Sequence, residues 1–132
     1  MKRGHSAFSV MMLLTIPFVG CPTHCVDPDV PAIAAIKKVQ IAEAEFLGRC
    51  GRYGELKELG RRGAGLLSSE LTKGNVNGHK LVLAVGQSHY SVQTIPIGWQ
   101  KSGFRSFYSD ETLVLRKSDG PAAANYSSPV LP

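Results

Sequence analysis

The stretch AIAAIKKVQIAEAEFLGRC, residues 32–50, decides how this chain folds. At 3.6 residues per turn, its large apolar side chains fall on one face of a helix. The members of that face are Ile33, Ile36, Val39, Phe46, Leu47 and Cys50. Glycines at 48, 51 and 54 weaken the end of the segment and stop it. We therefore expect a long helix over 32–50 whose apolar face needs a second layer to cover it.

After Asn77-Gly78 the apolar pattern becomes that of β-strands. Two hairpins are predicted, and their strand segments are 80–85 with 90–95, and 104–109 with 113–117. The sequence thus predicts an α+β fold in which a long N-terminal helix packs on a small antiparallel sheet of about four strands. The order of the strands stays open at this level.

The first 20 residues have the composition of a secretory signal peptide. Lys2 and Arg3 give a positive start, and residues 8–19 form an apolar run. The run is shorter than the about 20 apolar residues that a spanning helix needs, and Pro17 disfavours a continuous helix. We expect residues 1–20 to be a signal peptide. The alternative is an N-terminal core helix.

The end of this run, Phe18-Val19-Gly20-Cys21, is similar to a bacterial lipobox, in which a small residue precedes a cysteine that becomes lipidated. This similarity predicts lipidation at Cys21 and a proline-rich spacer up to residue 31. Two or more acyl chains hold a protein stably on a membrane surface. The alternative is ordinary cleavage between Val19 and Cys21, which gives a free secreted domain.

Two further cysteines, Cys25 and Cys50, form the candidate disulfide of an oxidising compartment. They flank the expected helix, and a helix of about 20 residues spans about 30 Å. The bridge therefore closes only if the chain after Cys25 folds back along the helix. The alternative is a buried, unpaired Cys50 on the apolar face. Too few Cys and His ligands cluster to predict a zinc site, and we expect no metal and no other cofactor.

Glu43 lies near the middle of the apolar face of the expected helix. A buried carboxylate is costly unless it is paired or hydrogen-bonded. We expect Glu43 to accept backbone N–H groups or to pair with an arginine of the sheet, and Arg105 is the predicted partner. A catalytic acid or base is the alternative, but no histidine or second acid motif lies near it in the sequence. With no nucleophile–base pair either, the chain is predicted not to be an enzyme.

The chain has 15 basic and 10 acidic residues, which gives a formal net charge of +5. Part of this excess lies in the leader, at Lys2 and Arg3. No run of Lys and Arg with interleaved aromatic residues occurs, so nucleic acid is not the expected partner. The glycine-rich connector over 53–67 lacks both the dinucleotide-binding and the Walker spacing.

Residues 32–46 resemble the soluble half of the long helix in type IV pilins and type II secretion pseudopilins. Tyr53, Leu56 and Leu59-Gly60 are similar to the Tyr-x-x-Leu-x-x-Leu-Gly connector of that family, and residues 105–112 fit a pseudopilin-like subset. The resemblance implies a pilin-like domain over 32–119, followed by a Pro/Ala-rich tail over 120–132 that lies over the surface or is mobile.

Two features depart from the family pattern. Pilins begin with a Gly-Phe cleavage motif and carry a glutamate five residues into a continuous hydrophobic helix, and neither occurs in this leader. Leu113 stands where the related hairpin has glycine. Because glycine permits positive φ and leucine disfavours it, we expect this hairpin to use another turn.

The resemblance implies an exported, non-enzymatic protein of a bacterial secretion or surface assembly. The lipid anchor would hold it at the periplasmic or outer-surface face of a membrane, with other envelope or pilin-like proteins as partners. The alternative function is a minor-pilin-like adhesin or DNA-contacting module, for which the candidate residues are Arg61, Arg62, Lys73 and Lys101.

Overall fold

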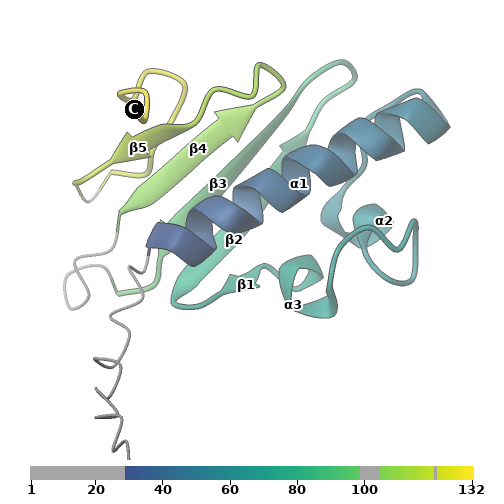
Figure 1. Cartoon of the computed structure of the whole chain (residues 1–132), viewed down its shortest axis with the longest axis horizontal. Helices are drawn as coiled ribbons and strands as arrows, with labels where there is room; N and C mark the ends of the chain where they lie inside the picture. The colour runs from purple at the N-terminus through teal and green to yellow at the C-terminus, as the bar shows by residue number, and fades with distance from the viewer. Residues whose placement is uncertain (1–28, 99–104, 121) are drawn as a thin grey trace, which may run out of the picture.

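The computed structural model describes residues 29–98, 105–120 and 122–132. One long helix, α1 (Asp29–Cys50), lies across one face of an antiparallel sheet (Figure 1). The strands pair in chain order, and they are β1 (Asn75–Val76), β2 (His79–Val85), β3 (Tyr90–Pro96), β4 (Ser106–Asp110) and β5 (Arg116–Ser118). Two short helices, α2 (Leu56–Leu59) and α3 (Ser69–Thr72), lie in the connection from α1 to β1.

These elements confirm the α+β class and the long helix on an antiparallel sheet. The sheet has five strands rather than about four, because the chain before Asn77-Gly78 pairs back on β2. Both turn residues have positive φ, 26° at Asn77 and 84° at Gly78, as a tight two-residue hairpin requires. The extra strand, β1, has only two residues, so it gives no periodic signal of its own.

α1 begins at Asp29, so residues 29–31 of the expected spacer form its first turn. The negative charge of Asp29 interacts favourably with the positive N-terminal end of the helix dipole. Pro31 lies in the first turn, where a backbone N–H would have no partner within the helix. The helix ends where Gly51, with φ of 70°, donates its N–H to the carbonyl of Leu47 at 2.9 Å.

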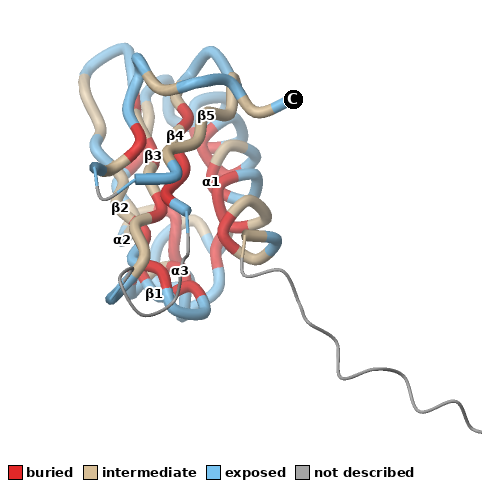
Figure 2. The backbone as a smooth tube through the Cα atoms, turned by 90° about the vertical axis from the view of Figure 1, so that its left-hand side faces the viewer, coloured by how far each residue is buried: buried red, intermediate tan, exposed pale blue. Residues whose placement is uncertain are grey.

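The core lies between α1 and the facing side of the sheet, as the buried residues in Figure 2 show. Strand register places Val92 and Phe107 on that side, and both are almost fully buried against Ile36 and Val39 in the same core cluster. Thr94 of β3 pairs with Phe107 of β4, and this register sets which side chains of the two strands face α1. The strands therefore close over the helix face that the periodicity predicts.

Two residues assigned to the buried helix face are exposed. Leu47 lies about 100° round the helix from Phe46, at the border of the face, and 39% of it is accessible. Cys50 is an exposed free thiol in the last turn, so the expectation that it is buried is wrong. Cys25, its candidate disulfide partner, lies outside the described residues.

The second hairpin keeps the turn that a glycine would favour, with leucine in its place. Leu113 has φ of 63° and donates its N–H to the carbonyl of Asp110 at 2.9 Å. The Asp110 side chain also accepts from the backbone N–H of Thr112 at 3.0 Å, which holds the turn closed. The expectation of another turn is therefore wrong, and the aspartate and the flanking strands hold Leu113 in a conformation that leucine disfavours.

Replacing Leu113 with glycine should raise the free energy of unfolding by about 0.5–1 kcal/mol. The left-handed conformation costs a non-glycine residue about 1–2 kcal/mol, and glycine's greater freedom in the unfolded chain takes back part of that gain. Little burial is lost because Leu113 is 62% exposed. Urea denaturation measures the change, and Leu113→Ala is the matched control. Alanine keeps the penalty, so an equal gain in both variants would contradict the explanation.

The C-terminal tail lies over the surface rather than extending away from it. Ala124 is buried on the side of the sheet opposite α1, where its N–H donates to Ser106 Oγ and its carbonyl accepts from Gln93 Nε2, both at 2.8 Å. Farther along, the tail runs antiparallel to β5, with an isolated bridge between Arg116 and Val130. The described tail residues therefore cover part of the second sheet face and its β5 edge.

Candidate functional site

The connection between α1 and β1 builds a pocket whose wall is dominated by basic side chains. It has a volume of about 580 Å³. Its lining residues, here called the basic pocket, are Lys57, Arg61, Arg62, Ser69, Thr72 and Lys73. Three of them are basic residues that the sequence suggested as DNA contacts. The fourth candidate, Lys101, lies outside the described residues, and Lys57 was not foreseen.

The backbone around the basic pocket is fixed by its own hydrogen bonds. Gly63 donates to the carbonyl of Gly60 at 2.9 Å, and Ala64 donates to that of Glu58 at 2.8 Å. Gly60 also lies so close to α3 that a Cβ there would be 2.5 Å from Thr72 Oγ1. This close approach, which only glycine permits, brings the turn that carries the arginines beside α3.

The charge of the basic pocket is not neutralised from within. Glu58, the acidic residue of α2, is held by Arg52 through Nη1–Oε2 and Nη2–Oε1 contacts of 3.0 and 2.6 Å. This hydrogen bonding lowers the pKa of Glu58 to about 2. Within residues 29–98, 105–120 and 122–132, none of the four basic pocket side chains lies in an ion pair. The residues that line the pocket therefore include four basic side chains and no acidic one.

A second feature, a buried carboxylate, lies beneath the loop that follows α1. Glu43 is fully buried, and its Oε2 accepts the backbone N–H of Gly54 at 2.9 Å. Its other oxygen, Oε1, has no hydrogen-bond partner among the residues described. Burial raises the pKa of Glu43 to about 6, and burial together with the nearby Glu43 carboxylate raises the pKa of Tyr90 to about 12.

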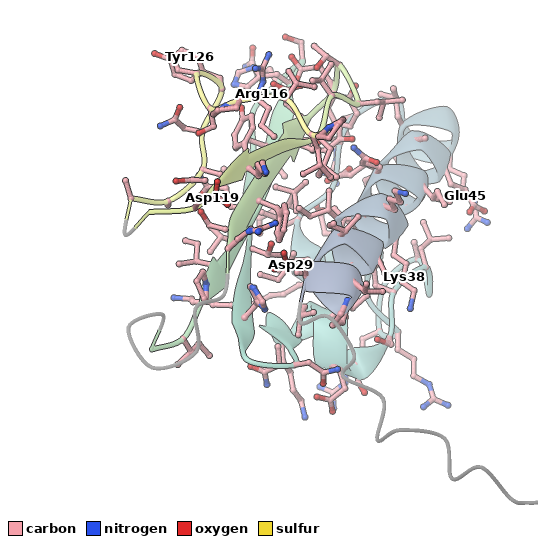
Figure 3. The ribbon with its side chains drawn as sticks, turned by 60° about the vertical axis from the view of Figure 1, so that its left-hand side comes forward. Asp29, Lys38, Glu45, Arg116, Asp119 and Tyr126 are labelled. Carbon is pink, nitrogen blue, oxygen red and sulfur yellow. The ribbon has the colours of Figure 1, made fainter. Side chains whose placement is uncertain are left out.

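The predicted pair of Glu43 with Arg105 is wrong. Arg105 instead contacts Asp119, with Nε–Oδ1 at 2.8 Å, and Asp29, with Nη1–Oδ2 at 3.5 Å. Asp29 and Asp119 lie on the same side of the molecule (Figure 3). Asp29 is 14 residues before Glu43 on the helix, a rise of about 21 Å at 1.5 Å per residue. Glu43 therefore accepts a backbone N–H group, as the other expectation had it. Arg105 joins the start of α1 to the segment after β5.

The stability of the protein should depend on pH through Glu43. The folded-state pKa is raised from 4.5 to about 6, so between these values the folded state binds more protons than the unfolded state. The contribution of Glu43 to the free energy of unfolding is therefore present at low pH and is lost as the pH rises through about 6. The loss is about 2 kcal/mol, for a shift of about 1.5 pKa units. Glu58, with its lowered pKa, has the opposite effect at lower pH, where its contribution is lost on acidification.

Glu43→Gln isolates this contribution. The free energy of unfolding of the variant minus that of the parent protein should rise by about 2 kcal/mol between pH 4.5 and 7, because the amide does not titrate. Urea denaturation at several pH values measures the difference. Glu45→Gln, on the exposed side of the same helix, is the control for changing a carboxylate to an amide. A flat curve for Glu43→Gln would mean that the carboxylate is not protonated near pH 6.

The part of the chain that the structure describes has neither a group of metal ligands nor a helix that could span a membrane. No three His, Cys, Asp or Glu side chains there are grouped so that they could hold a metal ion. Among its helices, none has both the length and the hydropathy needed to cross a bilayer. The candidate lipidation site, Cys21, is outside these residues.

Comparisons with protein-family models, with curated protein sequences and with solved structures find no match to this chain.

Proposed function

We propose that the protein is a non-enzymatic, exported interaction protein of a bacterial envelope or secretion assembly, with a pilin- or pseudopilin-like domain and a lipid anchor at Cys21. The observation that carries the proposal is the two-sided character of α1. Its inner face is buried by the sheet, while its outer face still carries apolar side chains. Val30 and Ile41 are 57% and 69% exposed.

These two residues are 11 positions apart, which brings them to within about 20° of each other on the helix. Ala34 and Ala44 lie about 40° to either side of Val30, and the exposed Lys37 lies between them. A helix that only supports a core gains nothing from apolar residues on this outer line. An assembly protein does, because the outer line offers a contact surface to a neighbouring subunit. The pilin-type resemblance supports the same use of a long helix.

The test of the proposal has two parts, and the first is mass spectrometry of the mature protein recovered from bacterial membranes. We expect an N-terminal, acylated Cys21, and a Cys21→Ser variant should leave the membrane fraction. A retained leader, or cleavage near Gly4, would contradict the lipid anchor. The second part is chemical cross-linking in cells, in which Ile41→Asp should remove cross-linked partners that Leu113→Asp, at an exposed apolar residue of the β4–β5 turn, retains. Equal cross-linking in both variants would contradict the role of the outer line.

A second candidate function, a minor-pilin-like adhesin or DNA-contacting module, is favoured by one observation. The adjacent Arg61 and Arg62 line one pocket together with Lys73, which lies 11 residues farther along the chain. This candidate predicts binding to duplex DNA that weakens steeply as salt is raised.

A further inference from the structure

We propose that the basic pocket binds the phosphate group of an anionic ligand, either a lipid headgroup or a free phosphate compound. The proposal goes beyond an assembly role and does not depend on the lipid anchor. It starts from the pocket's composition: four cationic side chains and two hydroxyls line it, and no carboxylate does. Water-exposed cations with no ion-pair partner attract anions, and a concave surface concentrates the field.

The chemistry of the donors favours phosphate over a simple carboxylate. Arg61 and Arg62 each carry a planar guanidinium that can donate two parallel hydrogen bonds to a phosphate or carboxylate. Lys57 and Lys73 add two compact charges, for a total that suits a group with two negative charges. A single carboxylate would leave most of this charge unmatched.

The hydroxyls have different parts in the site. Thr72 already donates its hydroxyl proton to the carbonyl of Ser68 at 2.8 Å, so it shapes the wall and does not donate to a ligand. Ser69 makes no side-chain hydrogen bond with the rest of the described chain and is exposed, so its hydroxyl is available as a donor. We therefore assign the ligand contacts to the four cations and Ser69.

The size of the basic pocket suits a small group. Its volume of about 580 Å³ lies within the range of about 300–1,000 Å³ that is usual for small-molecule sites. A phosphate with an attached glycerol or a second phosphate fits such a space. The turn that carries the arginines is held by backbone hydrogen bonds and by the close contact of Gly60 with Thr72. The backbone of the site is thus formed before a ligand arrives.

A nucleic acid strand fits the basic pocket less well. Binding of single strands combines a long basic track with aromatic side chains that stack on the bases, and none of the lining residues is aromatic. The cations all lie between residues 57 and 73, around one pocket rather than along a groove. The geometry therefore favours one phosphate-bearing group at a time.

The experiment compares two double variants of the full chain. Arg61→Gln/Arg62→Gln removes two charges from the basic pocket, and Lys37→Gln/Lys80→Gln removes two exposed charges from α1 and β2, outside it. Flotation with phosphatidic acid vesicles, against phosphatidylcholine vesicles, tests a lipid headgroup whose phosphate is a monoester. Isothermal titration with inorganic pyrophosphate tests a free phosphate compound. Thermal unfolding checks that both variants fold.

We expect the pocket variant to lose at least about tenfold in affinity, since two guanidinium groups that donate charge-assisted hydrogen bonds are removed. The control should stay within about twofold of the parent protein, because its lost charges act only through the screened net charge. Binding to phosphatidic acid vesicles alone would identify the lipid source, and pyrophosphate binding would identify a free phosphate compound. Absence of binding in both arms, or equal losses in both variants, would overturn the proposal. So would tighter binding of duplex DNA that the pocket variant alone loses.

Discussion

Replacing Phe107 with alanine should lower the free energy of unfolding by about 4 kcal/mol. Phe107 is 1% exposed and is one of the largest fully buried side chains of the described chain. It lies on β4, on the inner side of the sheet, in the same core cluster as Ile36 and Val39 of α1. Truncation of a buried phenylalanine loses its transfer free energy and leaves a cavity, for a total of about 3–5 kcal/mol. Small domains are stable by about 5–15 kcal/mol, so this loss is a large fraction of the total stability.

Urea denaturation followed by far-UV circular dichroism measures this loss. Tyr126→Ala is the control, because Tyr126 is 74% exposed on the tail and its removal should change stability by less than about 0.5 kcal/mol. If the two variants lose similar amounts, α1 is not packed on this side of β4, and the arrangement of helix and sheet is wrong.

Replacing Gly63 with alanine is expected to cost about 3 kcal/mol, although it adds only one methyl group. An added Cβ would lie 2.1 Å from the carbonyl oxygen of Glu58. That oxygen is backbone and accepts the N–H of Ala64, so it cannot move without breaking the turn. Overpacking usually costs about 1–3 kcal/mol, and a clash with backbone belongs at the upper end.

Gly48→Ala provides the matched comparison, because the same change at an open helix position should stabilise the protein. Nothing lies within 4 Å of a Cβ at Gly48, and alanine is preferred to glycine in a helix by about 0.5–1 kcal/mol. Opposite signs for the two variants in urea denaturation would support the geometry of the turn. Equal effects would show that the turn is looser than described.

The elements with a strong local pattern could be predicted from the sequence. The apolar spacing over residues 32–50 is long enough to predict the helix, and residues 80–95 alternate around a recognisable turn. β1 was missed because two residues carry no period. The positive φ of Leu113 differs from the expectation, because a local preference of about 1–2 kcal/mol is overridden by the strands on either side of the turn.

The candidate site was harder to predict, because it depends on contacts between distant segments. The partner of Arg105 is set by the meeting of the helix start with the segment after β5, which no local pattern encodes. Three basic pocket residues stood out by charge, but Lys57 joins them only because Gly60 packs on Thr72. The capping box of Glu55 and Glu58, and Ser68 before α3, were local signals for the two short helices that position the site.

The order of the elements along the chain has a consequence during synthesis. α1 is made first, and β4, which carries Phe107, begins 56 residues after α1 ends. At about 5–20 residues per second, the ribosome takes about 3–11 s to make that interval. During this interval, the part of the apolar helix surface that β4 covers is still accessible to chaperones or translocation factors. Before folding is complete, the nascent chain can therefore bind a chaperone or aggregate with other chains.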